Sequence, residues 1–489
     1  MEHTTLLVLA VFIPVIGSFL LPLLGRMSPR ARNAVAFLLV AAALLCSIGL
    51  LPVVWGGKTV TVSLTGFLAS QAPLGIDFKL QADALAVFVA IVSSLISAII
   101  LFYSTAYISH YGHQNEYYLM VVLFLGAMMG LVYSANLILL YVFWEITALA
   151  SWRLIGFFRE KAIVIKADKA FLVTVFGALA MLLGFISVYT QTGTFDIPQV
   201  KQFFLTPGQA LSPLATVLIL FGILSKSATL PFHTWLPDAG VAPSPVTALL
   251  HAAVLVKIGV YVFARLFVAT FKMTPDMNEL LLWTAAASAL VSAAAALIDT
   301  DIKRIIAYST VSQIAFIFLG FASGADIGIA GALLYILMHG IAKGGLFLCA
   351  GIVEQNTHTK NITQMGGLIR TMPVTAVAFL LCAFSVMGVP PFGGFFSKYM
   401  VIAGAVEHHL PIAMVFIFGA FLTILYLLRL FYKVFLGEPQ GDLPKEGSPV
   451  MVGSVALLGL MSLVSGLLVS PSSEFAFKAI APFIAAAGK

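Results

Sequence analysis

Five ionisable side chains in this sequence lie inside or beside long apolar runs, where a charge is hardest to accommodate. They are Glu145, Lys226, Lys257, Lys343 and Lys398. A charge at the centre of a bilayer costs about 2.5–3.5 kcal/mol on insertion scales, and such residues typically mark ion pathways and proton relays. Because lysine and glutamate both titrate, we expect this set to pass protons or to hold charges that gate another ion.

Glu145 and Lys226 are the natural partners within this set, because they carry opposite charges. Burial disfavours the charged form of each side chain, whereas close pairing favours it. A lysine that moves toward or away from the glutamate therefore has a switchable affinity for a proton. The alternative is a carboxyl group that only stabilises packing.

Two histidines accompany the central lysines. His251 precedes Lys257 by six residues, about 9 Å of helical rise, and is expected to relay protons between Lys226 and the cytoplasm, with a packing role as the alternative. His339 and Lys343 are four residues apart and share one helix face. Two basic groups that repel when both are charged favour a coupled titration over a static pair.

Lys398 ends the series, with snorkelling to the interface as its alternative role. Arg153, Arg265 and Arg429 lie nearer to the ends of apolar runs. Arginine does not release its proton usefully, so we interpret these three as snorkelling or head-group contacts. The titratable groups together predict a polar line across the membrane plane at mid-depth, which suits ions hopping along ordered water rather than a carrier with a central cavity.

The composition indicates a polytopic membrane protein. Of 489 residues, 61% are hydrophobic and 9% are charged, against roughly 25% charged in soluble proteins. The net charge of +6 is scattered between apolar runs and does not indicate nucleic-acid binding. Cys46, Cys349 and Cys382 lie in apolar runs without a C-x-x-C spacing, so no metal or cluster is expected. With no nucleotide motif or catalytic triad found, the chain is expected to hold no cofactor and not to be catalytic alone.

Apolar runs of about 20 residues predict an all-α membrane fold with about fourteen spans. The expected spans are 4–25, 33–55, 82–108, 115–134, 136–157, 167–190, 211–234, 244–270, 278–299, 303–322, 328–353, 372–404, 409–435 and 450–470. Between the second and third spans, alternating residues from Gly56 to Gln81 predict a short hairpin on one face of the membrane.

The seventh and twelfth spans are expected to be discontinuous. Pro231 interrupts one, and Pro390 and Pro391, followed by two glycines, interrupt the other. Such breaks are tolerated at depth only inside protein or beside a wet cavity. Because the broken helices are five spans apart they run in opposite directions, which predicts two inverted five-helix repeats, spans 4–8 and 9–13. The expected segments are 1–114 with three helices, 115–275 and 276–437 as the repeats, and 438–489 with the last helix and tail.

Lysine and arginine gather on one side of the predicted spans. That side includes Arg26, Arg30, Arg32, Arg159, Lys161, Lys166, Lys169, Lys303, Arg304, Lys360, Arg370, Arg429, Lys433 and Lys445. The positive-inside rule places this side in the cytoplasm. Both termini are then expected to face outward, in a multi-pass protein of the inner membrane of a prokaryote.

Several motifs resemble one known family. They are Trp144-Glu145, Lys226-Ser227-Ala228, Leu230–Ala239, Pro243–Val246 before His251, Asp301–Thr310 and Gly393–Lys398. They resemble the antiporter-like proton-channel subunits of respiratory complex I, of energy-converting membrane-bound hydrogenases and of Mrp cation/proton antiporters. The resemblance implies fourteen helices, discontinuous seventh and twelfth helices, and a Glu–Lys pair with central lysines that carry protons.

The resemblance implies a proton-translocating subunit of a multisubunit, redox-driven membrane complex, with the hydrogenase branch favoured. Expected partners are other integral membrane subunits, with peripheral iron–sulfur, hydrogenase or quinone-reducing subunits; the expected ions are protons and also Na⁺. One alternative is a subunit of an Mrp-type Na⁺/H⁺ antiporter without redox chemistry. An alternative of another class is a passive structural membrane subunit.

Overall fold

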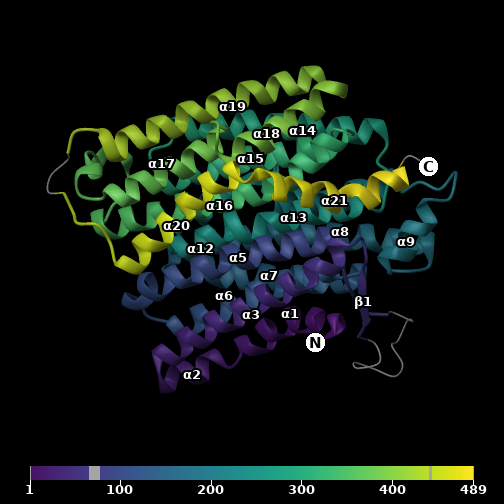
Figure 1. Cartoon of the computed structure of the whole chain (residues 1–489), viewed down its shortest axis with the longest axis horizontal. Coiled ribbons are helices and arrows are strands. Elements are labelled where there is room, and N and C mark those ends of the chain that lie inside the picture. The colour runs from purple at the N-terminus through teal and green to yellow at the C-terminus, as the bar shows by residue number, and fades with distance from the viewer. Residues whose placement is uncertain (1, 65–76, 440–442, 488–489) are drawn as a thin grey trace.

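The computed structural model describes residues 2–64, 77–439 and 443–487. Within them the chain folds as a bundle of helices laid side by side (Figure 1). The earliest helices, α1 to α3, form one edge of the bundle in that view, and α14, α18 and α19 form the other. The last helix, α21, crosses in front of the central helices. The all-α membrane fold predicted from the sequence is confirmed.

The N-terminal part consists of helices and one short hairpin. Its helices are α1 His3–Ser18, α2 Leu21–Met27, α3 Pro29–Trp55, α5 Ala84–Tyr107, η2 Ile108–His110, α6 Gln114–Tyr133 and α7 Leu137–Ile155. Strands β1 (Val60–Ser63) and β2 (Lys79–Ala82) pair antiparallel, with Val60 opposite Ala82. The expected hairpin is therefore present at its base, while residues 65–76 lie outside the described residues.

The middle part contains the first interrupted helix and the most buried span. Its elements are α8 Lys161–Thr192, α9 Ile197–Phe204, α10 Pro213–Lys226, η3 Phe232–Thr234, α11 Trp235–Asp238, η4 Ala239–Val241, α12 Ser244–Ala248, η5 Leu249–Ala253, α13 Leu255–Phe263 and η6 Ala264–Val268. The segments η5 and η6 are π-helical turns within one continuous span. Such turns are rare and are frequent at functional sites.

The last part begins with three long helices. Its elements are α14 Pro275–Ile298, α15 Ile302–Ala322, α16 Asp326–Thr357, η7 Ile362–Gln364, η8 Leu368–Arg370, α17 Pro373–Met387, α18 Gly393–His408, α19 Leu410–Phe431, η9 Tyr432–Leu436, α20 Pro449–Leu467 and α21 Val469–Ala487.

Short polar residues begin several of these helices. The side chain of Asn136 accepts hydrogen bonds from the backbone of Ile138 and Leu139 at the start of α7, and Asp301 does the same for α15. An N-cap of this kind satisfies backbone donors that have no partner inside the helix. These caps fix where α7, which carries Glu145, and α15 begin.

Eleven described helices are long and apolar enough to cross a membrane, or twelve if the bent pair of α1 and α2 is one span. Helices α10 and α17, with 14 and 15 residues, are apolar but shorter. They are the first halves of the two spans that we expect to be discontinuous. The two inverted repeats and the segment boundaries stay predictions.

The second interrupted helix shows why glycine is needed at the break. α17 ends at Met387, and Gly388 follows in the left-handed conformation with φ of 82°, which glycine adopts without steric cost. A Cβ at Gly394 would lie 1.8 Å from the carbonyl oxygen of Ser385. Only glycine lets α18 start this close to the end of α17, and this approach brings Lys398 to the break.

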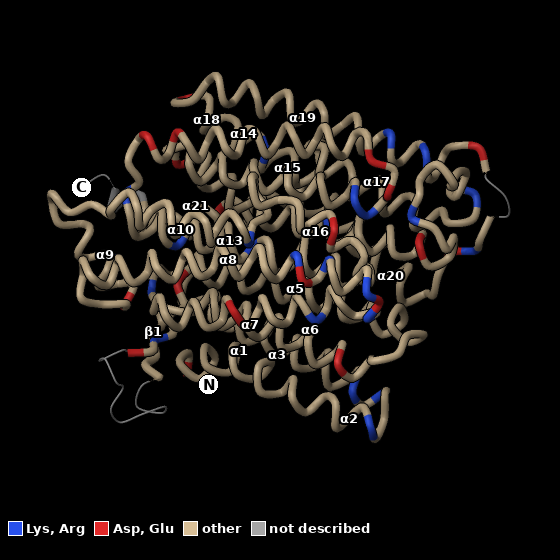
Figure 2. Tube along the Cα trace, turned by 180° about the vertical axis from the view of Figure 1, so that it is seen from behind, with Lys and Arg blue, Asp and Glu red and all other residues tan. Residues whose placement is uncertain are grey.

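The interior of the bundle holds polar side chains, while its outer surface is apolar. On α8, Leu172, Phe176, Leu179 and Leu183 are exposed at helical spacing, as expected for a face turned to lipid. The charged residues outside the core crowd the end of the bundle that carries α2 and the connection from α19 to α20 (Figure 2). We call this the basic end, and it includes Arg30, Lys303 and Lys360.

Candidate functional site

The first of the buried charges sit on two neighbouring helices. Lys226 is the last residue of α10 and is fully buried, and Glu145 lies in the middle of α7. Nζ of Lys226 donates to the backbone oxygen of Trp144 at 3.0 Å and lies 5.1 Å from the centre of the Trp144 ring. The lysine is therefore held beside Glu145 rather than on it.

The direct pairing of Glu145 with Lys226 is absent from this structure. Oε1 of Glu145 is buried without a hydrogen-bond partner. Lys226 instead donates to the backbone carbonyl of Trp144, the preceding residue of α7. Lys226 is the last residue of α10, and its ammonium group contacts the backbone of α7 instead of the side-chain carboxylate of Glu145. The switch between the two that the sequence predicts stays a prediction.

The second group joins two helices through a lysine and a histidine. Nζ of Lys257, on α13, lies 2.7 Å from Nδ1 of His339, on α16, and both side chains are buried. The two nitrogens are close enough for a direct hydrogen bond between them. The sequence did not pair these residues, because it placed them 82 positions apart.

Lys343 lies one turn from His339 on the same helix and binds a hydroxyl and a backbone oxygen of α15. Its Nζ donates to Oγ of Ser309 at 2.6 Å and to the backbone oxygen of Ile306 at 3.0 Å. The Tyr426 hydroxyl, from α19, donates to the same Ser309 oxygen at 2.8 Å. All of these side chains are buried.

Gln313 extends this hydroxyl network toward the end of the line. Its amide nitrogen lies 3.2 Å from Oγ1 of Thr423 and 3.5 Å from the Tyr426 hydroxyl. Its amide oxygen accepts a hydrogen bond of 2.6 Å from Tyr335. The Tyr335 ring centre lies 5.8 Å from Nζ of Lys398. A polar route therefore runs from Lys343 to the neighbourhood of Lys398.

Lys398 is bound at the second helix break. Its Nζ donates to the backbone oxygen of Val386 at 2.7 Å and lies 4.7 Å from the Phe316 ring centre. Val386 is in the last turn of α17, where carbonyl groups lack helical partners and carry partial negative charge. Lys226 and Lys398 thus share one design, in which a buried ammonium group next to a broken helix is held by a single backbone carbonyl.

The predicted site residues lie on five helices: Glu145 on α7, Lys226 on α10, Lys257 on α13, His339 and Lys343 on α16, and Lys398 on α18. That they form one line across the bundle stays a prediction. His251 is in the π-helical turn η5, with its ring 4.3 Å from that of Phe347 and both ring nitrogens buried without a partner. Buried polar groups without a protein partner are usually satisfied by internal water.

Arg265 is not a snorkelling side chain, which corrects our expectation. It is 9% exposed and makes an ion pair with Asp83, at 2.5 and 2.8 Å, and contacts the Tyr261 hydroxyl. The other two arginines are also bound within the protein, Arg153 to Glu116 and Arg429 to the backbone oxygen of Asp299. Asp83, Glu116 and Asp299 lie at or beyond helix ends, where sequence alone does not indicate which charge they meet.

Asp83→Ala is expected to destabilise the protein by about 3–5 kcal/mol, because it leaves the guanidinium of Arg265 buried without its counter-charge. Thermal unfolding of the purified protein in detergent measures the effect. The double variant Asp83→Ala with Arg265→Met removes both charges and should recover most of the stability. Equal stability of Asp83→Ala and the unaltered protein would contradict this account.

No three histidine, cysteine, aspartate or glutamate side chains of the described residues gather closely enough to hold a metal ion. No role was predicted from the sequence for the polar network of Ser309, Gln313, Tyr335 and Tyr426, or for Asp83. Two signals were available: Ser309 lies in the motif Asp301–Thr310, and Ser309 and Gln313 share one face of α15.

These features agree with known proteins. A family model described as NADH:quinone oxidoreductase/Mrp antiporter, TM, matches residues 134–423, and the chain belongs to this family. It is a multi-pass integral membrane protein and an antiporter-like subunit of the Mrp and complex I family.

Three comparisons describe the likeness. An Na(+)/H(+) antiporter subunit of Alkalihalophilus pseudofirmus is 37% identical over 454 residues, which are 85% of this chain and 56% of the relative. NAD(P)H-quinone oxidoreductase subunit 5, chloroplastic, of Anthoceros angustus is 34% identical over 406 residues, 80% of this chain and 55% of the relative. A chain of the Mrp complex from Dietzia sp. has a TM-score of 0.89 at 24% identity, with 98% of this chain and 97% of that chain covered. The chain thus spans little more than half the length of these two curated relatives.

Proposed function

We propose that this chain translocates protons along its line of buried lysines and histidines, as one membrane subunit of a larger complex. The observation that carries the proposal is the contact of 2.7 Å between Lys257 and His339, flanked by Lys343 with its hydroxyl network. A shared proton between two buried bases is difficult to explain by packing, because apolar residues of similar size would fill the space without the desolvation penalty.

Glu145 sets the proton affinity of Lys226 in this mechanism. When Lys226 donates to the Trp144 carbonyl, only the partial negative charge of that oxygen stabilises the ammonium group, and the lysine releases its proton more easily. When it moves to the Glu145 carboxylate, the full opposite charge favours the ammonium form. Alternation between the two partners loads and unloads the first site of the line.

Two energy sources fit this site. The 37% identity to an Na(+)/H(+) antiporter protein supports cation/proton antiport without redox chemistry. The 34% identity to an NAD(P)H-quinone oxidoreductase protein supports the redox-driven complex, with peripheral electron-transfer subunits, that the sequence analysis favoured. We place antiport first, because that relative matches more of this chain, and we expect an inner membrane of a prokaryote as its location.

The experiment that separates them is affinity purification in mild detergent from the native host, with mass identification of the subunits that co-purify. Only further membrane subunits, together with Na⁺-dependent proton flux in vesicles that lack electron donors, would support antiport. Co-purifying iron–sulfur, nickel–iron or quinone-site subunits, with proton flux that requires an electron donor, would support the redox-driven complex. Purification of this chain alone would overturn both.

Tyr426→Phe is expected to lower proton flux by about tenfold or more, since a positioned proton-transfer group typically contributes at least that much. The change removes one buried hydroxyl, the donor to Ser309, and keeps the ring. Dye-detected proton flux in membrane vesicles measures it. Tyr133→Phe is the matched control, because the Tyr133 hydroxyl also binds a buried serine, Ser47, at 3.0 Å but lies away from the line. Equal proton flux in Tyr426→Phe and Tyr133→Phe would show that the Tyr426 hydroxyl is not part of the proton path.

A further inference from the structure

A cavity of about 620 Å³ opens at the basic end of the bundle, where five elements meet. Its walls come from the end of α5, the residues before α12, the start of α15, the end of α16 and the residues before α20. His110 and His358 are exposed at its rim, and Glu354 and Lys303 line its inner part. We call it the inlet cavity. The line of buried charges lies outside it.

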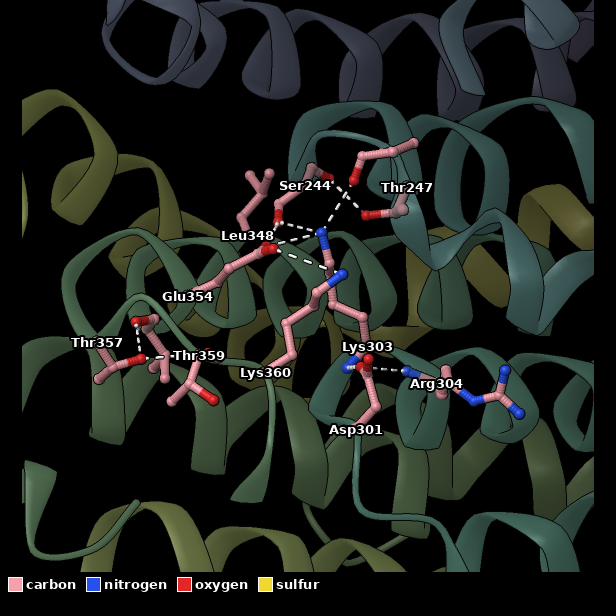
Figure 3. Close-up of polar contacts among 12 residues, drawn as sticks. Ser244, Thr247, Asp301, Lys303, Arg304, Leu348, Glu354, Thr357, Thr359 and Lys360 are labelled. Atoms are coloured by element: carbon pink, nitrogen blue, oxygen red, sulfur yellow. Dashed lines mark hydrogen bonds and ion pairs between the residues drawn. The ribbon is translucent and has the colours of Figure 1, made fainter. Parts of the chain in front are cut away.

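Lys303 is fixed in this cavity by several acceptors. It is 1% exposed, and its Nζ contacts the backbone oxygen of Ala242 at 2.9 Å, Oγ of Ser244 at 3.3 Å and Oε2 of Glu354 at 2.7 Å. Figure 3 shows Lys303 reaching up between α15 and the start of α12 to meet Glu354. With this many partners, the Lys303 side chain is held in one position.

Glu354 and Lys360 are the partly exposed charged groups of this cluster. The Glu354 side chain is 23% exposed, and its Oε1 lies 3.9 Å from Nζ of Lys360. Its other oxygen accepts a hydrogen bond of 3.2 Å from Ser244 as well as the contact from Lys303. One oxygen of the carboxylate therefore points to the cavity, and the other points to the interior. Two positive charges, those of Lys303 and Lys360, hold it in place.

The interior side of this cluster leads toward the charged line. Ser244 begins the span that carries His251 and Lys257. Its hydroxyl faces Gly351 of α16, where an added Cβ would lie 3.0 Å from Oγ of Ser244 and 2.8 Å from the hydroxyl of Tyr103. The hydroxyls of Ser244 and Tyr103 thus both lie beside Gly351, where any larger residue would crowd them. His251, with both nitrogens unpartnered, follows two helical turns further along.

We propose that the inlet cavity is where protons enter the line, and that Glu354 takes them up from water and passes them toward Ser244. This inference rests on the proposed function. The step balances without electron transfer: a hydronium ion protonates the carboxylate, water is released, and the same proton later leaves to the Ser244 side, which restores the carboxylate. Lys303 keeps Glu354 in position.

The test compares three glutamate variants in membrane vesicles that contain the whole complex. Glu354→Gln keeps the size and the hydrogen bonds to Lys303 and Ser244 but cannot carry a proton, and we expect proton flux to fall by about 100-fold, a typical contribution of a positioned proton-transfer group. Glu354→Asp is shorter but titrates, and should retain more flux than Glu354→Gln. Glu160→Gln, at an exposed position of the same end, is the control.

The order of the variants separates proton uptake from packing. A purely structural Glu354 predicts that Glu354→Gln transports better than Glu354→Asp, and this order, or full flux in Glu354→Gln, would overturn the inference. Absence of proton flux in the unaltered complex would instead overturn the proposed function, and the inference with it. Flux that is lost only in Glu354→Gln and lowered in Glu354→Asp supports both.

A labelling experiment decides the question if the glutamate variants do not assemble. Thr359 lines the cavity, and the native cysteines Cys46, Cys349 and Cys382 are buried. A bulky, charged thiol reagent on Thr359→Cys should block proton flux, and the same reagent on the exposed Lys58→Cys should not. Undiminished flux after complete labelling of Thr359→Cys would show that protons enter elsewhere.

Discussion

Lys226→Ala is expected to reduce proton translocation by about 100-fold or more, the contribution of a positioned proton-transfer group, without loss of assembly. The substitution removes a fully buried charge whose hydrogen-bond partner is one backbone carbonyl. Since that carbonyl also accepts a hydrogen bond from Thr147, it stays paired in the variant, and the fold should persist. Proton flux in vesicles and co-purification of the partner subunits measure the two effects.

Two further variants show which property of Lys226 matters. Lys226→Arg keeps the positive charge but does not release its proton, so it should be as inactive as Lys226→Ala. Glu145→Ala should also abolish translocation, because it removes the second partner of Lys226. Lys58→Ala, on the exposed loop before β1, is the control. Normal flux in Lys226→Ala or Glu145→Ala, in an assembled complex, would refute the alternation of Lys226 between a carbonyl and a carboxylate.

Lys343→Ala is the second change with a large expected effect. Lys343 connects the Lys257–His339 unit to the hydroxyl network around Ser309 and Tyr426. Its removal interrupts the line at the centre, and we expect a loss of flux of about 100-fold. Thermal stability should fall little, because taking away a buried charge offsets part of the cavity that is left. Lys343→Met, which fills that cavity, should be as inactive and at least as stable as the unaltered protein.

This pair of variants tests the alternative of a passive structural subunit. A scaffold needs the shape of the side chain and not its proton, so it predicts normal flux in Lys343→Met. A proton path predicts that both variants are inactive whatever their stability. Flux measurements on vesicles with equal amounts of assembled complex distinguish the two outcomes, and activity of Lys343→Met near that of the unaltered protein would favour the scaffold.

The sequence predicted the fold class and the identity of the buried charges for one physical reason. Runs of about 20 apolar residues have few other uses than to cross a membrane, so an ionisable residue within them is conspicuous. Glu145, Lys226, Lys257, Lys343 and Lys398 were found in this way. The prolines and glycines near Lys226 and Lys398 also predicted interrupted helices, because these residues act on the local backbone.

Contacts between distant helices were not predictable in the same way. The sequence paired Lys226 with Glu145 by charge, but the tertiary structure places the ammonium group on the carbonyl of Trp144. The sequence predicted that Arg265 lies at the membrane interface, whereas in the structure this residue is bound to Asp83, 182 positions away. Gln313 and Tyr426 are common polar residues with no conspicuous context, and Ser309 stands out only as part of the motif Asp301–Thr310. Their roles depend on which helix faces overlap.

The sequence by itself therefore determined that this is a multi-pass helical membrane protein, and which rare charges it buries. Hydropathy and helix breaks are properties of short segments, and they are readable residue by residue. Only the tertiary structure decided that Lys257 contacts His339, where the hydroxyl network runs, and that Lys303 and Glu354 line a cavity at the basic end. Those facts depend on distances of a few ångströms between residues far apart in the chain, and packing alone fixes such distances.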